Sequence, residues 1–201
     1  MIYIVRHGQT DWNVEHRKQG QIDIPLNEAG KNEARLCGEK IATLHIDQII
    51  SSDLSRAKET ANIINEFFSV PVHFDSRLRE INFGDLQGIF GKDMTEELWH
   101  ILNYEPKKIH AESLGEVCER VKSFFAELDS TKDTLIVTHG GVIRMVMYLS
   151  CHPQSFDVSE FEHVALQFRA QNTGVFSWDG ARQFQALSDE FFEKSDNLEK
   201  T

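Results

Sequence analysis

Cysteine is scarce in this chain, and its spacing argues against a disulfide framework. The three cysteines, Cys37, Cys118 and Cys151, lie far apart, and none forms a Cys-x-x-Cys pair. An odd, sparse set of this kind is typical of free thiols in a reducing compartment. The first predicted strand starts at the N-terminus and leaves no room for a signal peptide. We therefore expect a cytoplasmic protein.

Long hydrophobic runs and an excess of basic residues are absent too. No apolar stretch approaches the length of a membrane span. The 32 aspartates and glutamates outnumber the 21 lysines and arginines, which gives a formal net charge of −11. A field of this sign disfavours nucleic acid and anionic membranes as partners. It permits a small phosphorylated metabolite, provided that cationic groups gather in one pocket.

The spacings of common metal sites are also missing. The sequence contains no HExxH or CxxC motif and no close cluster of histidine and aspartate. We therefore expect neither a metal nor another cofactor.

The chain has 201 residues. This length predicts a single domain over 1–201. The predicted strands are 2–5, 46–51, 70–74 and 135–137, and the predicted helices are 28–41, 54–68, 113–128 and 142–149. Segments 164–168 and Val175–Trp178 predict a closing antiparallel hairpin. This alternation predicts a three-layer α/β/α sandwich with a mostly parallel central sheet and an antiparallel edge.

Two segments lack this regularity. Residues 85–110 have weak periodicity and mixed charge, so we expect a loop with a helical excursion that forms a lid over a pocket. Residues 189–201 are acidic, and we expect a loosely ordered tail there.

Two predicted strands end on a histidine followed by a glycine. Residues 2–5 lead into Arg6-His7-Gly8, and residues 135–137 lead into Thr138-His139-Gly140. Ligands of open α/β sheets bind beyond the carboxyl ends of the strands. If the two strands are neighbours, His7 and His139 meet at one site beside Arg6. Such a group suits the chemistry of anions.

His7 taken alone is best explained as a buried structural residue, with a metal ligand or a nucleophile as alternatives. Its neighbours favour function, because Arg6 offers a charged fork that fits phosphate oxygens and Gly8 allows a ligand to approach the backbone. A free imidazole nitrogen can attack phosphorus and form a phosphohistidine. His139 precedes Gly140 and a predicted helix start, so its ring and the nearby amides can surround an oxyanion.

Arg56 follows the strand 46–51 at the start of the predicted helix 54–68. The N-terminus of a helix favours anions, and this position places Arg56 on the same rim as His7. Without that context, a surface ion pair with Glu59 or Asp53 would be favoured.

Glu80 is a candidate general acid. Burial beside Ile81 can raise the pKa of its carboxyl group enough for proton donation. A salt bridge to Arg77 or Arg79 is the alternative, and Asp85 is a competing carboxylate.

Ordered motifs along the chain resemble the histidine phosphatase superfamily, which includes the cofactor-dependent phosphoglycerate mutases. Segment 6–13 is similar to the RHGxTxxN signature of this family. The further similar segments are 17–20, 23–30, 51–57, the Glu80 segment, 112–114 and 138–141. They occur in family order from residue 1 to about residue 178. The resemblance implies a phosphoglycerate mutase-like fold.

The resemblance also implies roles for single residues. His7 would be the phosphorylated nucleophile, and Glu80 would donate the proton to the leaving oxygen. The residues that would bind the phosphoryl group or line its pocket are Arg6, Asn13, Gln19, Gly20, Arg56, His139 and Gly140.

The activity implied is that of a metal-independent phosphomonoesterase acting on a small metabolite. Mutases of the family carry an arginine after the acid and further arginines in a long insertion, whereas Ile81 follows Glu80 and 85–110 contains no arginine. Segment 80–88 looks more like the α-ribazole and broad-specificity phosphatases, which makes α-ribazole 5′-phosphate a candidate substrate. The alternatives are a phosphoglycerate mutase, a protein phosphohistidine phosphatase and a non-catalytic protein that binds phosphorylated ligands.

Side chains in and beside the lid predict an apolar or ring-shaped leaving group. They are Phe83, Leu86, Phe90, Trp99 and Tyr104. Of these, we assign Phe90 and Trp99 to the core of the lid rather than to the pocket.

Overall fold

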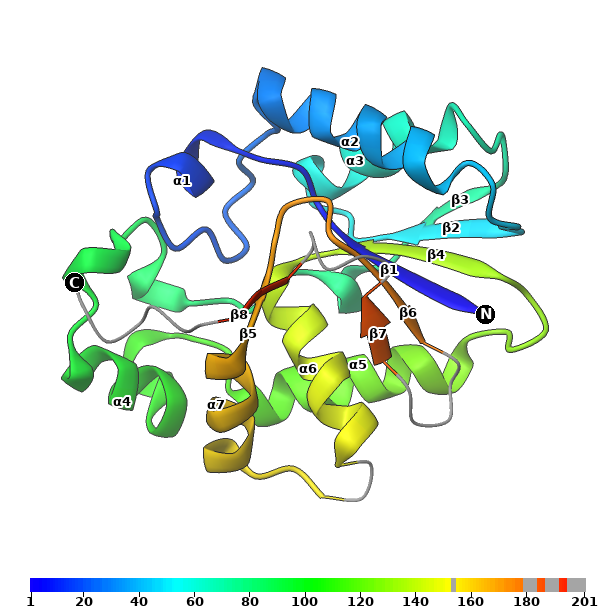
Figure 1. Ribbon diagram of the computed structural model, residues 1–201. Coiled ribbons are helices and arrows are strands. Elements are labelled where there is room, and N and C mark those ends of the chain that lie inside the picture. The colour runs from blue at the N-terminus through cyan, green and yellow to red at the C-terminus, as the bar shows by residue number, and fades with distance from the viewer. Residues whose placement is uncertain (153–154, 179–183, 187–191, 195–201) are drawn as a thin grey trace.

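A computed structural model of the chain describes residues 1–152, 155–178, 184–186 and 192–194 (Figure 1). Its main sheet has six strands in the order β3-β2-β4-β1-β6-β7. The strands are β1 (Ile2–Arg6), β2 (Gln48–Ser51), β3 (Val72–Phe74), β4 (Thr134–Thr138), β6 (Val175–Trp178) and β7 (Phe184–Ala186). The neighbours from β3 to β1 run parallel, and β6 is antiparallel to both β1 and β7. This arrangement confirms the predicted sheet with an antiparallel edge.

Helices cover both faces of the sheet, because alternate strand residues point to opposite sides. Ile4 and Ile136 pack with residues of α5 and α6, whereas Val5, Leu135 and Val137 pack with residues of α2 and α3. The α-helices are α1 (Asp11–Val14), α2 (Glu28–Ile41), α3 (Ser55–Asn65), α4 (Glu96–Tyr104), α5 (Leu114–Glu127), α6 (Gly140–Cys151) and α7 (Val158–Gln167). Short 3₁₀ helices span Ser76–Leu78, Gly84–Leu86, Gly91–Asp93 and Pro106–Ile109. The three layers are therefore confirmed.

Local sequence signals explain where the long helices begin. The Asn27 side chain accepts a hydrogen bond from Gly30 N at the start of α2. Ser113 and Glu116 form the expected capping box of α5. Each cap satisfies backbone N–H groups that the first turn of a helix leaves without partners.

The predicted hairpin between 164–168 and Val175–Trp178 is wrong. Residues 164–167 belong to the end of α7, and β5 (Phe168–Ala170) pairs with β8 (Phe192–Lys194) in a separate two-stranded sheet. Val175–Trp178 is a strand, but its antiparallel partners are β1 and β7. A helix forms here instead of the predicted strand because the helix buries Phe161 in the core beside α5 and α6. The predicted loose tail, 189–201, lies outside the described residues except for Phe192–Lys194.

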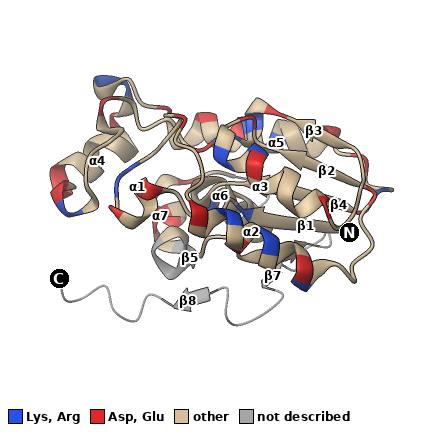
Figure 2. Cartoon of the chain, turned by 90° about the horizontal axis from the view of Figure 1, so that it is seen from above, with Lys and Arg blue, Asp and Glu red and all other residues tan. Residues whose placement is uncertain are grey.

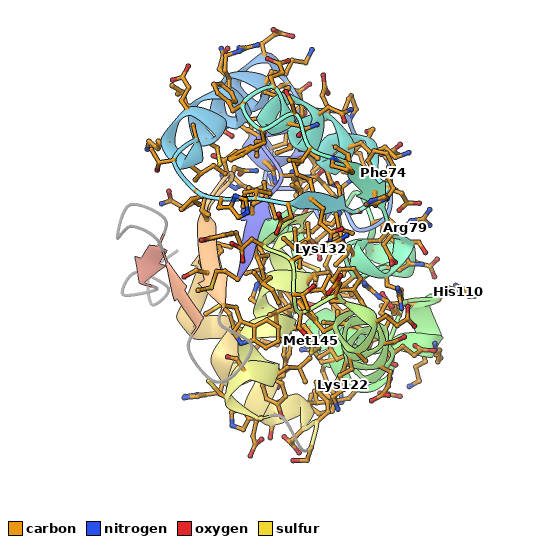
Figure 3. The ribbon with its side chains drawn as sticks, turned by 90° about the vertical axis from the view of Figure 1, so that its right-hand side faces the viewer. Phe74, Arg79, His110, Lys122, Lys132 and Met145 are labelled. Atoms are coloured by element: carbon orange, nitrogen blue, oxygen red, sulfur yellow. The ribbon has the colours of Figure 1, made fainter. Side chains whose placement is uncertain are left out.

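The predicted lid, 85–110, folds as a helical excursion around α4. Leu86 and Leu102 of this segment form a small core with Ala111, the residue that follows it. His110 lies at the outer margin of the molecule, whereas Met145 of α6 lies in its interior (Figure 3). The helix α4 of this segment lies on the side of the molecule toward which β1 runs (Figure 1).

Charged side chains spread over the outer helices and loops, while the central strands are largely uncharged (Figure 2). Within the described ranges, no helix combines the length and the apolar composition needed to cross a membrane.

Candidate active site

His7 and His139 lie side by side at the carboxyl ends of β1 and β4. The two strands pair Arg6 with Thr138, and His7 N donates to Thr138 O at 2.9 Å. The imidazole centroids are 5.0 Å apart, with 59° between the ring planes. The exposed fractions of His7 and His139 are 3% and 0%. The strand endings therefore place both rings in one buried site, as their positions predicted.

The hydrogen bonds of His7 determine its tautomer. Its Nδ1 lies 2.7 Å from Gly8 O, and a carbonyl oxygen only accepts, so Nδ1 carries the hydrogen. The lone pair of the neutral ring is then on Nε2, which can act as a nucleophile. Gly8 is required here because a Cβ atom would lie 2.4 Å from Gly30 O.

His139 is held from the opposite side. Its Nε2 lies 2.8 Å from Ser52 Oγ, which also accepts from Leu54 N at 3.3 Å. The Ser52 hydroxyl hydrogen can therefore be donated to Nε2, which leaves a hydrogen on Nδ1 of a neutral His139 ring. Nδ1 is buried and has no hydrogen-bond partner among the described residues. A buried polar atom in this state is costly until a ligand pairs with it.

Arg56 is fully buried and is held by carbonyl groups. Its Nη1 donates to Ile22 O at 2.9 Å and its Nη2 to Gly20 O at 2.7 Å. Neither alternative ion pair forms, because Asp53 binds Arg79 and Glu59 contacts Lys31. The Nε atom of Arg56 is buried without a hydrogen-bond partner in the described part of the chain.

Arg6 is the second guanidinium at this edge of the sheet. Its Nη1 donates to Ala170 O at 2.6 Å. A Cβ atom on Gly140 would lie 3.7 Å from Arg6 Nε, so the start of α6 runs beside the guanidinium. Arg6 and Gly140 therefore border the same region as the two histidines.

These surroundings keep both imidazoles uncharged. Burial lowers the pKa of His7 and that of His139 well below the ordinary value, and the charges of Arg56 and Arg6 lower both further. Burial also lowers the pKa of Arg56, to about 10, while Glu80 and Asp23 act in the opposite direction. At neutral pH the site combines guanidinium charges with neutral rings, which suits a bound dianion.

Glu80 faces the site from the segment after the Ser76–Leu78 turn. Its Oε1 accepts from Ile81 N and from Gly141 N, both at 3.0 Å, and its carbonyl accepts from Gln21 Nε2 at 3.0 Å. No salt bridge to Arg77 or Arg79 forms, because Arg77 binds Asp75 and Glu127 while Arg79 binds Asp53. The competing carboxylate, Asp85, is exposed and pairs with His110. Glu80 therefore lies at the start of α6, where its side chain contacts Gly141, two residues after His139, and its charge acts on Arg56.

The other predicted residues lie around the same edge. Asn13 Oδ1 accepts from Thr10 N at 3.0 Å, and no described residue accepts a hydrogen bond from its Nδ2. Gln19 is buried, and its Oε1 has no hydrogen-bond partner in the described ranges. Gly20 has a φ of 56° and directs its carbonyl to Arg56. Both side-chain amides thus keep polar atoms available to a ligand.

Several supporting residues were not predicted. Asn172 Nδ2 donates to His7 O at 2.9 Å, and Thr60 Oγ1 accepts from Gly8 N at 3.0 Å. Arg120 Nη2 donates to Glu80 O at 3.3 Å and its Nε to Glu112 Oε1 at 2.6 Å. Ser52 directly follows the predicted strand 46–51, which is a signal that we did not use, whereas Arg120 has no local signal.

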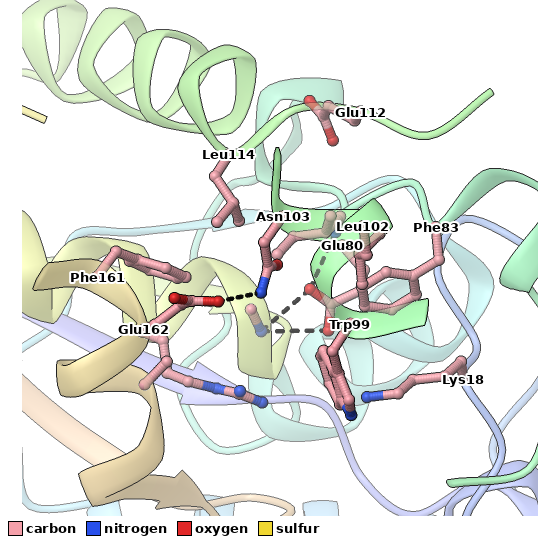
Figure 4. Close-up of a pocket in the computed structure, with 14 residues that line it drawn as sticks. Lys18, Glu80, Phe83, Trp99, Leu102, Asn103, Glu112, Leu114, Phe161 and Glu162 are labelled. Atoms are coloured by element: carbon pink, nitrogen blue, oxygen red, sulfur yellow. Dashed lines mark hydrogen bonds between the residues drawn. The ribbon is translucent and has the colours of Figure 1, made fainter. Parts of the chain in front are cut away.

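A cavity of about 370 Å³ adjoins Glu80 on the side of the lid (Figure 4). Its walls are mainly apolar and include Phe83, Trp99, Leu102, Leu114 and Phe161. The assignment of Trp99 to the lid core is wrong, because the residue lines the cavity and is 41% exposed.

The remaining predicted lid residues face elsewhere. Leu86 packs in the small core of the lid, and Phe90 lies against Arg17 with 4.1 Å from the ring centroid to Cζ. Tyr104 donates to Glu162 of α7. Within the described ranges, no three His, Cys, Asp or Glu side chains gather as a metal site would require.

Comparison with known sequences adds the family. The chain matches the family described as "Histidine phosphatase superfamily (branch 1)" over residues 2–188. It is 40% identical over 148 residues to "Probable phosphoglycerate mutase GpmB" of Salmonella paratyphi A, with 69% of each chain covered. It is 35% identical over 151 residues to "Uncharacterized phosphatase PhoE" of Bacillus subtilis, with 73% of this chain and 75% of that relative covered.

Solved structures show the same architecture. A mycobacterial glucosyl-3-phosphoglycerate phosphatase superposes with a TM-score of 0.76 at 27% identity, covering 93% of this chain and 97% of that one. Bacillus stearothermophilus YhfR superposes with a TM-score of 0.76 at 28% identity, covering 94% and 95%.

The buried neutral histidines predict a loss of stability in acid. In the unfolded chain each imidazole has a pKa of about 6.5, so below that pH the unfolded state binds protons that the folded state does not. Between pH 7.5 and pH 5.5, we expect His7 and His139 each to lower the free energy of unfolding by about 1.4 kcal/mol. Urea denaturation in phosphate-free buffer, with His7→Gln/His139→Gln as the comparison, measures this. An equal pH dependence in both proteins would contradict the burial of neutral rings.

Proposed function

Since the chain belongs to the histidine phosphatase superfamily and its relatives support an enzyme of the phosphatase type, we propose that it hydrolyses a small phosphomonoester. The reaction proceeds through a phosphohistidine intermediate. One observation carries this proposal. Two buried neutral imidazoles lie 5.0 Å apart in a site that also contains two arginines and a backbone-held glutamate. The arrangement offers a nucleophile, charge stabilisation and a proton donor around one phosphoryl group.

In the first step, Nε2 of His7 attacks phosphorus, and the bond from phosphorus to the leaving oxygen breaks. Glu80, in its protonated form, donates its proton to that oxygen, so the product leaves as an alcohol. The hydrogen bond from His7 Nδ1 to Gly8 O holds the ring and stabilises the positive charge that it acquires.

Stabilisation of the phosphoryl oxygens is assigned to groups already fixed in place. Arg6 and Arg56 contribute charge, and the hydrogen on Nδ1 of His139 and the amide of Gly140 contribute hydrogen bonds. Because carbonyl groups hold Arg56 before any ligand binds, little reorganisation is needed. Asn13, Gln19 and Gly20 complete the wall of the pocket in this proposal.

In the second step, water attacks the phosphohistidine. Glu80, now a carboxylate, takes a proton from the water, and His7 leaves as the neutral ring. Inorganic phosphate is released, and His7 and Glu80 return to their starting protonation states. This cycle uses no metal and no second substrate besides water.

Mutase activity is a second candidate, because a relative at 40% identity is named a probable phosphoglycerate mutase. A mutase would require a bisphosphorylated activator and a phosphoenzyme that resists water. Conversion of 3-phosphoglycerate to 2-phosphoglycerate, assayed with the activator, distinguishes it from the phosphatase.

Replacement of His7 is the first test. In the presence of a chelator, we expect His7→Ala to lower phosphate release by about 10³-fold or more, because no bond to phosphorus can form. The panel consists of α-ribazole 5′-phosphate, 3-phosphoglycerate, a sugar phosphate and 4-nitrophenyl phosphate. His45→Ala is the control, since His45 is exposed and pairs only with Asp47 among the described residues. Equal release from His7→Ala and the wild type would remove His7 as the nucleophile.

Gly141 tests the placement of Glu80. A Cβ atom at this position would lie 2.3 Å from Glu80 Oε1, so Gly141→Ala displaces the carboxyl group. We expect kcat to fall by about 10- to 100-fold with the fold retained, because a shift of about 1 Å is enough to impair proton transfer. Gly115→Ala is the matched control, since its added methyl meets nothing nearer than Ser113 Oγ at 4.0 Å. An unchanged kcat in Gly141→Ala would argue against Glu80 as the acid.

A further inference from the structure

Lys18 directs an ammonium group into the cavity beside Glu80 (Figure 4). Its backbone is fixed, because Lys18 N donates to Ile89 O at 2.9 Å and Lys18 O accepts from Gly88 N at 2.8 Å. The Nζ atom lies 4.1 Å from the ring centroid of Trp99 and 5.6 Å from that of Phe83. It forms no hydrogen bond or ion pair with any described residue. The aromatic faces orient the charge without neutralising it.

The carboxylates of the cavity are occupied by other partners. Glu112 binds Arg120, with 2.6 Å between Oε1 and Nε. Glu162 accepts hydrogen bonds from Asn103 and Tyr104 of α4. Glu80 accepts from backbone amides. None of these carboxylates pairs with the Lys18 ammonium.

A second cation lines the same cavity. Arg144 of α6 and burial both lower the pKa of Lys18, to about 8, with burial the larger effect and Glu80 opposing it. Two like charges that face one partly desolvated space disfavour each other. An anion bound to the Lys18 ammonium would offset this repulsion.

The charges and walls of the cavity define what fits. Glu112 is paired to Arg120 and Glu80 is held by backbone amides, so the Lys18 ammonium has no carboxylate in ion-pair contact among the described residues. The single charge of this ammonium matches a monoanion such as a carboxylate better than the dianion of a second phosphate. The walls are mainly apolar and the volume is about 370 Å³. The cavity therefore has room for a ring-sized group between the phosphoryl group and the carboxylate of a ligand.

We propose that Lys18, with Arg144 beside it, forms an anion subsite that selects phosphomonoesters whose leaving alcohol is an apolar, ring-sized hydroxy acid. The carboxylate of this leaving group binds Lys18, and its ring packs on Trp99 and Phe83. The inference rests on the proposed phosphatase function and adds the class of its substrate. A neutral ring compound such as α-ribazole would fill the apolar part of the cavity and leave the subsite empty.

A matched pair of substrates tests the subsite. 4-Carboxyphenyl phosphate and 4-carbamoylphenyl phosphate have the same shape and differ in one charge. We expect the wild type to prefer the carboxylate by about tenfold or more in kcat/KM, as a charged hydrogen bond allows. Lys18→Met should abolish that preference, mainly through KM, and leave the carboxamide within about threefold of the wild type. Lys92→Met, on a lid lysine that does not line the cavity, should keep the preference.

The pH dependence of the same ratio supplies a readout that a merely structural lysine would not change. Both substrates undergo the same chemical step, so the pH dependence of that step cancels in the ratio. The other charged groups that face Lys18 across the cavity are Arg144, Glu112 and Glu162. The preference should be present below about pH 8 and decline above it as Lys18 loses its proton. Lys18→Arg should retain the preference at higher pH.

Each outcome decides between the proposals. Hydrolysis of both compounds without a preference, or equal losses for both in Lys18→Met, overturns the subsite and leaves the phosphatase intact. Hydrolysis of 4-nitrophenyl phosphate but of neither compound also overturns the subsite. Failure to release phosphate from any of the three overturns the phosphatase and the inference with it.

Discussion

The register between β1 and β4 is the constraint on which the rest of the site depends. His7 N bonds to Thr138 O, so the residue that follows each strand projects into the same space. A slip of one residue would turn every side chain of a strand to the opposite face of the sheet. The register is held by burial, since all five residues of β4 are buried and Ile136 packs on one face while Val137 packs on the other. Core packing far from the chemistry therefore sets the distance between the two histidines.

The buried positive charge of Arg56 has no carboxylate among its hydrogen-bond partners in the described part of the chain. Arg56 is fully buried, and the groups that hold it are carbonyl dipoles rather than a carboxylate. Such an arrangement is unfavourable for the empty protein, because burial weakens the hydration of the charge without a full counter-charge. Burial lowers the pKa of His7 most, and the charge of Arg56 lowers it further, so the ring stays neutral as the proposed role of nucleophile requires. A bound phosphoryl dianion would offset the unfavourable burial. The buried charge therefore lowers the stability of the ligand-free protein and raises its affinity for the anion.

Much of this arrangement could be predicted, because its signals are local. Apolar runs that stop on a histidine and a glycine located β1, β4 and the paired rings, and the capping box located α5. The predicted hairpin was wrong because strand pairing depends on residues distant in the sequence. Here β6 pairs with β1, the first strand of the chain. Asn172 and Arg120 were missed for the same reason, since their partners His7 and Glu80 lie 165 and 40 residues away. Polar residues that act through tertiary contacts leave no periodic pattern in the sequence.

The two sides of the proposed active site, one assigned to the phosphoryl group and the other to the leaving group, differ in how they are built. The phosphoryl side rests on the sheet, where a change of register or of core packing would affect every group at once. The leaving-group side rests on the lid, which has its own small core and is tied to α7 through Glu162. Side chains there can change while the histidines keep their positions. Glu80 belongs to both sides, because it accepts from Gly141 at the start of α6 and also lines the cavity. A charge in the leaving group therefore lies close to the group proposed to protonate it, so recognition and proton transfer are coupled at that carboxyl group.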